Sequence, residues 1–324
     1  MIRDLQHARH PVDHLVRRVG DHLALLRPTH AAKSLVAISI GPALMLGEAT
    51  LPALVTLAGA IALFVLASSA VYVVNDLADV ERDRLHPKKR LRPLASGAVT
   101  PTAALWMLAG LAAGMVVLAI VLPPLLGVIV FLYLACNLAY SLALKHTPIV
   151  EMLIVAAGFA LRTASGYVAF SAMPDPWVIA TVLAGSLLLT IGKRRAELQR
   201  AHDSAEHRPV LAHYSQPLLD AYLLVAGIAC FAASLAVLVD TLSSVNRPAL
   251  VFVSLPFVIY LFQRYLLLAF AGRGTGNPTR LLLGDRVTHV VLVAWAATLV
   301  LAALLGDVVL DGWVAALEAG GTLS

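Results

Sequence analysis

Five side chains with oxygen donors lie in a nine-residue stretch, N-D-L-A-D-V-E-R-D, at residues 75–83, and four of them are candidate metal ligands, namely Asn75, Asp76, Asp79 and Asp83. Asn75, Asp79 and Asp83 are spaced four apart and Asp76 follows Asn75, so a helix would carry the spaced three along one face. Carboxylate and amide oxygens are ligands that Mg²⁺ accepts, commonly together with phosphate oxygens and water. The stretch therefore predicts a metal site that binds Mg²⁺-pyrophosphate, with the three aspartates as its catalytic residues.

A run of cations follows the acidic stretch at once, and its members are Lys88, Lys89, Arg90 and Arg92. One interpretation is structural, namely a solvated helix end whose acidic and basic side chains pair with their neighbours. The other is functional, because Lys and Arg side chains bind phosphate oxygens strongly. The acidic face and the basic run together favour a site for metal-bridged phosphates, with these four cations as substrate-binding residues.

The elements that must position these groups are membrane helices. Of the 324 residues, 60% are hydrophobic and only 13% are charged, and a helix needs about 20 apolar residues to cross a bilayer. We predict nine apolar spans in the chain. They lie near 34–48, 51–75, 103–121, 123–143, 148–171, 177–193, 218–240, 249–271 and 287–306. The predicted fold class is therefore an all-α integral membrane protein with nine transmembrane helices around a cytoplasm-facing cavity.

The distribution of basic residues predicts the orientation of these helices. With the N-terminus inside, the cytoplasmic segments are 1–33, 76–102, 144–147, 194–217 and 272–286. Of the 24 lysines and arginines, all but Arg162 and Arg247 lie in these segments or beside them. Because basic residues favour the cytoplasmic side, the acidic stretch should face the cytoplasm of a cell membrane. The net charge of +5 then needs no nucleic-acid partner.

The chain divides into three parts by composition. Residues 1–33 are polar and basic, and their apolar positions recur at helical spacing, which predicts an amphipathic helix on the inner membrane surface. Residues 34–306 form the predicted nine-helix domain, and residues 307–324 form a short tail outside the cell. The two cysteines, Cys136 and Cys230, lie in apolar spans and are interpreted as buried free thiols.

Two further charged residues and two helix-end residues lie where polar groups are costly. Arg162 falls about the middle of the fifth predicted span, where an ionisable residue is by default a functional candidate. Glu151 begins the same span and could bind a ribose hydroxyl or form an ion pair with Lys145. Tyr140 and Lys145 end the fourth span, where an aromatic anchor and a snorkelling lysine are the structural alternative.

The acidic stretch and the H-P-x-K-R-x-R-P-L-A-S-G run after it resemble the UbiA superfamily of intramembrane prenyltransferases. Later segments resemble the branch of that superfamily that transfers phosphoribosyl groups to polyprenyl phosphates. These segments read Y-S-L-A-L-K-H at 140–146, L-R-T-A-S-G-Y-V-A at 161–169, G-K-R-R-A-E-L at 192–198, Y-S-Q-P-L-L-D at 214–220 and N-P-T-R-L-L-L-G-D-R at 277–286. The resemblance spans nearly the whole chain and implies nine helices, with Tyr140 and Lys145 facing the same cavity as the acidic stretch. Arg27, Pro28 and Lys33 resemble the family's R-P-x-x-x-x-K entry to the first helix, and Lys33 is predicted as a substrate-binding residue.

One departure from the wider superfamily bears on the substrate. Other members have a second aspartate-rich motif at the cytoplasmic end of the sixth helix, whereas here that position reads G-K-R-R-A-E at 192–197. Fixed cations in place of a second metal site fit a donor with an additional phosphate, such as 5-phosphoribosyl 1-pyrophosphate (PRPP). Lys193 and Arg194 are accordingly predicted as substrate-binding residues, with positive-inside anchoring as their structural alternative.

The resemblance implies a Mg²⁺-dependent transfer of phosphoribosyl from PRPP to decaprenyl phosphate, with release of pyrophosphate, in a pathway that feeds cell-wall arabinan synthesis. An aromatic prenyltransferase of quinone or haem biosynthesis is the alternative enzyme, although it would need the second aspartate motif. A transporter would also have many spans, but it predicts ionisable residues along the membrane midplane, where only Arg162 lies. The sequence leaves the oligomeric state open.

Overall fold

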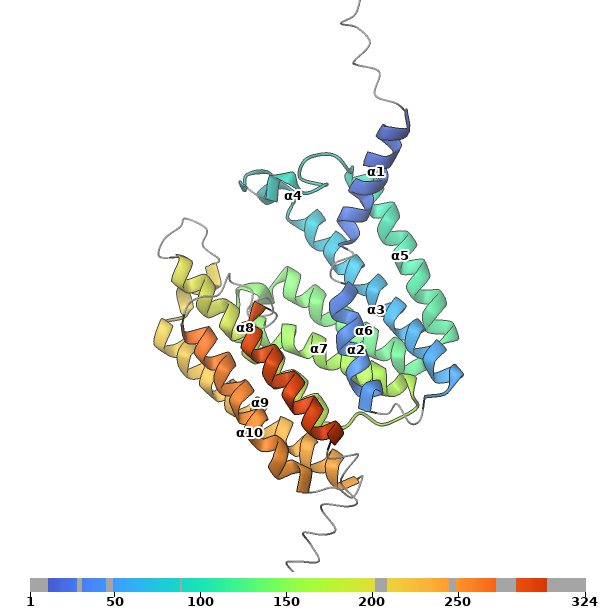
Figure 1. Cartoon of the computed structure of the whole chain (residues 1–324). Helices are drawn as coiled ribbons and strands as arrows, with labels where there is room; N and C mark the ends of the chain where they lie inside the picture. Colours follow the sequence, from blue (N-terminus) through green and yellow to red (C-terminus); the bar gives the residue numbers. More distant parts are fainter. Residues whose placement is uncertain are drawn as a thin grey trace, which may run out of the picture. The chain divides into compact units, whose positions relative to one another are not determined.

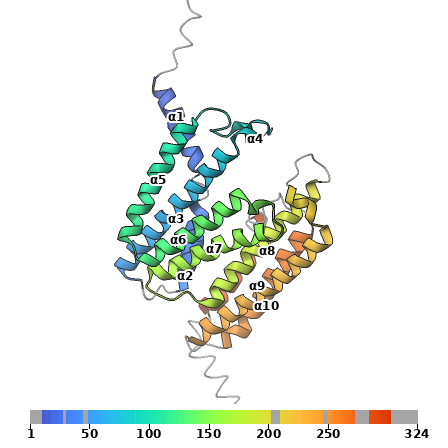
Figure 2. The same cartoon turned by 180° about the vertical axis from the view of Figure 1, so that it is seen from behind.

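The computed structural model describes residues 11–27, 31–44, 49–87, 89–201, 209–244, 249–271 and 284–301, and within these ranges the regular structure is entirely helical. The side chains of residues 11–18 and 31–34 are not among those described. The chain forms two compact units, Met1–Asp175 and Pro176–Ser324, which are treated separately below (Figures 1 and 2).

The first unit is built around one long helix. Its α-helices are α1 (Pro11–Leu26), α2 (Ala31–Leu44), α3 (Leu51–Ala78), α4 (Val80–Arg84), α5 (Pro101–Val121), α6 (Pro124–Leu142) and α7 (Val150–Ala169), with single 3₁₀ turns at η4 (Lys89–Leu91) and η5 (Leu144–His146). Helix α3 packs against α1, α2, α5, α6 and α7. Thr50 and Thr100 cap α3 and α5 with their side-chain oxygens, and a proline follows each cap, which is a favourable way to begin a helix.

The core of the first unit lies between α3, α6 and α7. Phe64 of α3 is fully buried, and its ring packs against Tyr133 of α6 at a centroid distance of 5.4 Å. Helices α2 and α7 approach closely at Gly166, where a Cβ would overlap the Ile38 carbonyl oxygen. Small residues permit such contacts between apolar helices, where packing rather than water exclusion drives association.

The second unit contains α8 (Pro176–Ala201), η6 (Pro209–His213), α9 (Gln216–Ser244), α10 (Ala249–Phe270) and a last helix over residues 286–301. Arg264 of α10 donates two hydrogen bonds to Asp285, at 3.0 and 2.8 Å, which ties α10 to the start of that last helix. Hydrogen bonds from Arg264 and from the Thr288 hydroxyl hold the pKa of Asp285 below its usual range.

Seven of the nine predicted spans correspond to helices that are long and apolar enough to cross a membrane, namely α3, α5, α6, α7, α8, α9 and α10. The first predicted span corresponds to α2, which has 14 residues, and the last to the shorter apolar helix 286–301. The nine-span count, the orientation and the extracytoplasmic position of the tail stay predictions, and residues 307–324 lie outside the described part.

Helix α1 lies in the segment that the sequence assigns to the membrane surface, and that assignment stays a prediction. It contacts α3 near the end that carries the acidic stretch, and its Leu25 is fully buried there (Figures 1 and 2). Val19 and Leu23 are about half exposed, at 51% and 53%. These two side chains belong to the apolar positions from which the surface helix was predicted.

Candidate active site

The acidic stretch lies at the end of α3, but it does not form one continuous helix. Helix α3 ends at Ala78, Asp79 has φ −102° and ψ 3°, and α4 begins at Val80. The backbone hydrogen bond from Asp83 N to Asp79 O, 2.8 Å long, still connects the two helices. Asp79 and Asp83 have different ion-pair partners, so the ion pairs do not follow the single face expected for Asn75, Asp79 and Asp83.

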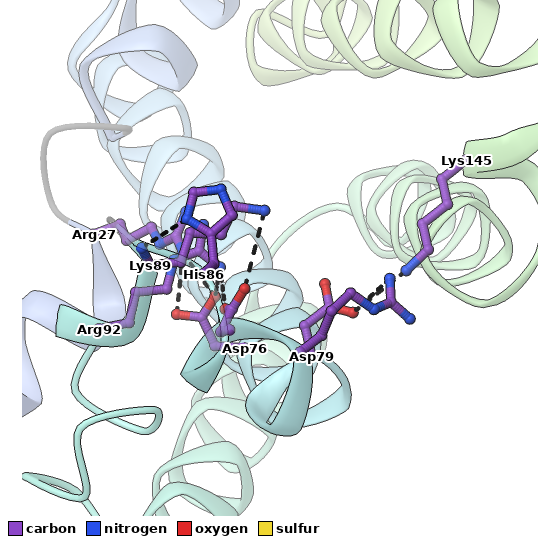
Figure 3. Close-up of polar contacts among 9 residues, drawn as sticks. Arg27, Asp76, Asp79, His86, Lys89, Arg92 and Lys145 are labelled. Carbon is purple, nitrogen blue, oxygen red and sulfur yellow. Dashed lines mark hydrogen bonds and ion pairs between the residues drawn. The ribbon is translucent and has the colours of Figure 1, made fainter. Parts of the chain in front are cut away.

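Asp76 and Asp83 are joined through Arg92, and Figure 3 shows Asp76 beside Arg92 and Arg27. Both carboxylates are buried, with only 3% of each side chain exposed, and both accept hydrogen bonds from the same nitrogen, Arg92 Nη1, at 3.1 and 2.6 Å. Arg27 Nη2 donates to the two oxygens of Asp76 at 2.7 and 3.0 Å, and Lys89 Nζ lies 4.0 Å from Asp83. We call Asp76, Asp83, Arg27 and Arg92 the four-charge cluster.

Asp79 turns toward a different part of the chain. Its Oδ1 lies 3.6 Å from Arg82 on α4 and 3.6 Å from Lys145 Nζ on η5, the turn that follows α6 (Figure 3). Lys145 therefore reaches the acidic stretch, which is where the family resemblance placed it. Tyr140, one turn before the end of α6, is half-buried.

Apolar packing holds the two arginines of the cluster in place. Leu25 lies two residues before Arg27 and Leu94 two residues after Arg92, and both leucines belong to one buried core with Val73 of α3. Arg27 has a left-handed backbone, with φ 51°, and its guanidinium lies 4.8 Å from the centre of the Tyr72 ring. The packing thus brings residues from α1 and from the loop after α4 to one end of α3.

The donor set of the cluster suits a divalent cation. Two carboxylate oxygens, Asp76 Oδ1 and Asp83 Oδ2, converge on one positively charged nitrogen, and oxygen ligands of this kind are what Mg²⁺ prefers. The predicted set of four ligands, Asn75, Asp76, Asp79 and Asp83, stays a prediction. Across the described ranges, no three His, Cys, Asp or Glu side chains are grouped as a metal site would require. Asp79 instead lies against Arg82 and Lys145, each at 3.6 Å.

Arg162 lies deep in α7 and is held by neutral groups. It donates to the Gly158 carbonyl oxygen at 2.8 Å, to the Tyr133 hydroxyl at 2.8 Å and to Ser68 Oγ at 3.0 Å. Its guanidinium also lies 4.4 Å from the centre of the Tyr133 ring. Ser68 is eight residues before Asp76 on α3, so a helical face extends from the cluster toward Arg162.

The remaining predicted site residues of the first unit differ in their burial, and two of them are not described. Glu151 is fully buried at the start of α7, two residues after Ile149, whose φ is 65°. Arg90 is exposed. Lys88 lies outside the described residues, and so does the side chain of Lys33.

The basic end of α8, in the second unit, contains one acidic partner. Lys193 Nζ lies 3.9 Å and Arg194 Nη1 2.5 Å from Glu197, one turn further along the same helix. Lys193 is half exposed, whereas Arg194 is 3% exposed. Arg195 instead joins helices, because it contacts Asp220 of α9 at 2.5 Å and donates to the Ala269 carbonyl oxygen of α10 at 2.9 Å.

Three residues of these sites, Arg27, Ser68 and Tyr133, were not among the predicted site residues, although Arg27 belongs to the run that resembles the family's entry to the first helix. Arg27 is 49 residues from Asp76, and no local spacing connects the two. Ser68 and Tyr133 could have been found, because polar groups inside apolar spans require partners. Asp76 and Asp83 could also have been paired, since seven residues are close to two helical turns.

Similar sequences connect this chain with one protein family. Residues 34–278 match the UbiA prenyltransferase family. A decaprenyl-phosphate phosphoribosyltransferase of Mycolicibacterium smegmatis is 34% identical over 250 residues, which cover 74% of this chain and 78% of the relative. A protein of the same name from Corynebacterium glutamicum is 33% identical and covers 77% and 76%.

Solved structures share the fold. A UbiA homologue from Archaeoglobus fulgidus, bound to GPP and Mg²⁺, superposes with a TM-score of 0.62 at 16% identity, over 86% of this chain and 98% of the other. The apo structure of a homologue from Aeropyrum pernix gives a TM-score of 0.60 at 21% identity, over 83% and 98%.

Proposed function

This chain belongs to the UbiA prenyltransferase family, and from that premise we propose that it transfers 5-phosphoribosyl from PRPP to decaprenyl phosphate and releases pyrophosphate. The sequence relatives that carry this activity in their names support the choice of reaction. The observation that carries the proposal for this chain is the convergence of Asp76 and Asp83 on one cation, beside further Lys and Arg side chains. Such a site suits a metal-bound pyrophosphate group.

Asp76 and Asp83 would hold the Mg²⁺ ion, with Asn75 and Asp79 next to them in the same stretch. When bound, the metal neutralises negative charge on the departing pyrophosphate. Lys89 and Arg92 lie beside the two carboxylates and would bind phosphate oxygens, and Lys88 and Arg90 belong to the same loop. Lys145 approaches Asp79 and would bind the donor from the opposite side of the stretch.

The reaction breaks the bond between ribose C1 and the pyrophosphate oxygen and forms a bond from C1 to an oxygen of the lipid phosphate. That lipid phosphate is already an anion at neutral pH, so it needs no strong general base. The chain's part is to orient the two substrates and to stabilise the charge that leaves with pyrophosphate. Glu151, buried at the start of α7, is the candidate ligand for a ribose hydroxyl.

The basic end of α8 supports PRPP rather than a prenyl diphosphate as the donor. Glu197 is the one acidic residue of the 192–197 segment, and it is shared between Lys193 and Arg194. A second metal site would need more carboxylates, whereas the segment retains an excess of positive charge that suits the 5-phosphate of PRPP. Lys193 and Arg194 are therefore proposed as donor-binding residues, and Arg162 and Lys33 as further substrate contacts.

We also propose that the site faces the cytoplasm of the cell membrane, where the soluble donor is present, and that the product feeds arabinan assembly in a cell wall. The orientation follows from the distribution of Lys and Arg. The lipid tail of the acceptor would remain among the apolar helices, while its phosphate reaches the cluster at the end of α3.

The test is a transfer assay on the purified chain in detergent. With Mg²⁺, radiolabelled PRPP and decaprenyl phosphate, we expect label in the lipid-soluble fraction, and EDTA should abolish it. A second reaction contains geranyl diphosphate and an aromatic acceptor, because a UbiA homologue of known structure binds GPP with Mg²⁺. Aromatic prenyl product without phosphoribosyl lipid, from folded protein, would overturn the proposal in favour of an aromatic prenyltransferase.

A further inference from the structure

The charges of the four-charge cluster balance without any metal. Asp76 and Asp83 contribute two negative charges and Arg27 and Arg92 two positive charges, and Lys89, 4.0 Å from Asp83, is a further cation beside them. The carboxylates are 3% exposed, while the Arg27 and Arg92 side chains keep 24% and 29% of their surface exposed. Carboxylates buried to this degree need a cation, and here the cations come from the protein itself.

A metal ion and the two arginines would compete for the same oxygens. Asp76 Oδ1 already accepts from Arg27 at 2.7 Å and from Arg92 at 3.1 Å, and Asp83 Oδ2 accepts from Arg92 at 2.6 Å. A divalent ion on these oxygens would displace guanidinium groups and leave two arginines beside an added double positive charge. Metal alone should therefore bind weakly to this chain.

A phosphate-containing donor removes this conflict. Pyrophosphate oxygens accept hydrogen bonds from guanidinium groups in a geometry that suits arginine, and their negative charge compensates the metal. An arginine displaced from Asp76 or Asp83 can then bind a phosphate a short distance away. Bound metal would increase the affinity for the donor, and bound donor would increase the affinity for the metal. The two increases in affinity must be the same factor.

The position of Arg27 suits such a change of partner. Its guanidinium lies over the Tyr72 ring at 4.8 Å, so a cation–π contact can keep it beside the site when its carboxylate partner is lost. Its backbone is left-handed, with φ 51°, a conformation that non-glycine residues adopt only where the surrounding structure holds them. The buried Leu25 and the hydrogen bond from Ser69 Oγ to the Leu26 carbonyl, at 3.2 Å, supply that support.

Resting on the proposed function, we propose that Arg27 and Arg92 are exchangeable cations that neutralise Asp76 and Asp83 in the free protein and move to the phosphates of the donor when the metal binds. Arg27, contributed by the N-terminal helix, is thereby a donor-binding residue of the site. The exchange makes tight metal binding conditional on the donor. A fixed structural ion pair would behave differently, because its loss would lower stability without making metal binding tighter.

The experiment measures Mn²⁺, a paramagnetic substitute for Mg²⁺, by the EPR signal of the free ion during titration of the purified full-length chain. Without donor, Arg27→Gln and Arg92→Gln should bind Mn²⁺ about tenfold more tightly than the original protein, a typical size for coupled sites. Arg84→Gln is the matched control, because it removes the same charge from the same region while its partner is the exposed Glu81. Arg84→Gln should change the affinity for Mn²⁺ by less than about twofold. Arg27→Lys, which keeps the positive charge, should bind Mn²⁺ with nearly the affinity of the original protein.

The original protein provides a second measurement that needs no variant. Saturating PRPP should increase its affinity for Mn²⁺ about tenfold, after correction for Mn²⁺ bound by PRPP in a titration without protein. Unchanged or weaker Mn²⁺ binding in both glutamine variants, or no gain with PRPP, overturns the exchange. Neither measurement depends on the transfer of phosphoribosyl to lipid. If PRPP increases Mn²⁺ binding but no phosphoribosyl lipid forms, only the proposed function is contradicted. If phosphoribosyl lipid forms but PRPP does not increase Mn²⁺ binding, only the exchange is contradicted.

Discussion

The end of α3 and the end of α8 both combine arginines with carboxylates, but they assemble them differently. At the end of α3, Arg27 and Arg92 reach Asp76 from 49 and 16 residues away, and the carboxylates are buried. At the end of α8, Lys193 and Arg194 pair with Glu197 within one helical turn. The first cluster depends on three separate segments packing together, whereas the second forms on a single helix.

The difference indicates how each group of charges can be used. Pairs within one turn of a helix contribute little stability, so Lys193 can leave Glu197 for a ligand at low cost. Buried carboxylates cannot be left without a cation, so the end of α3 must always contain arginine or metal. Arg195 adds a third pattern, because it lies in the basic segment but joins α8 to α9 and α10.

The largest effect is expected from the acidic stretch itself. Asp79→Ala and Asp83→Ala should each reduce transfer of phosphoribosyl to lipid at least about a hundredfold, because each removes a carboxylate from the metal-binding stretch. Glu197→Gln is the corresponding change at the end of α8 and should cost less than about fivefold. Initial rates across Mg²⁺ concentrations check both, with expression and elution volume as controls for folding. Near-original activity of either alanine variant would remove that aspartate from the site.

A second prediction separates Arg195 from its neighbours by stability. Arg195→Gln should lower the free energy of unfolding by about 2–3 kcal/mol, because it leaves a carboxylate and a carbonyl oxygen of two other helices without their donor. Thermal unfolding in detergent would show this as a lower Tm. An unchanged Tm would mean that Arg195 does not join the helices.

The adjacent residue should show the opposite pattern. Lys193→Gln should leave Tm unchanged, since Lys193 is half exposed and its pair with Glu197 is 3.9 Å long. It should raise KM for PRPP about tenfold, the effect of one lost charge-assisted contact to phosphate. A KM equal to that of the original protein would assign Lys193 to anchoring at the membrane surface.

The smallest effect is expected beside the first cluster. Arg84 pairs at 2.7 Å with Glu81, but 49% and 84% of these side chains are exposed. Arg84→Gln should therefore change the free energy of unfolding by less than about 0.5 kcal/mol and leave transfer rates within about twofold. A larger loss of activity would mean that the loop binds the donor through Arg84 as well, and the cluster would need to be extended.

Much of the fold could be predicted because its signals are local. Apolar runs of about 20 residues predict membrane helices wherever they occur, and seven such helices are present in the described residues. The acidic stretch and the cations after it could be recognised for the same reason, since residue types at short spacing determine which chemistry a segment can support. Lys145 could be placed near the stretch only through its resemblance to the family.

Only the tertiary structure decided which charges meet. Asp79 pairs with Arg82 and Lys145, whereas Asp76 and Asp83 share Arg92, although regular spacing favoured one continuous face. Arg27 joins the cluster because Leu25 packs in a core with residues of α3 and of the loop before α5, a contact that no periodicity encodes. The amino-acid sequence by itself thus determined the membrane helices and the kinds of charge at their ends. Packing between distant segments determined the pairs, because charges buried away from water must find partners wherever the fold brings them together.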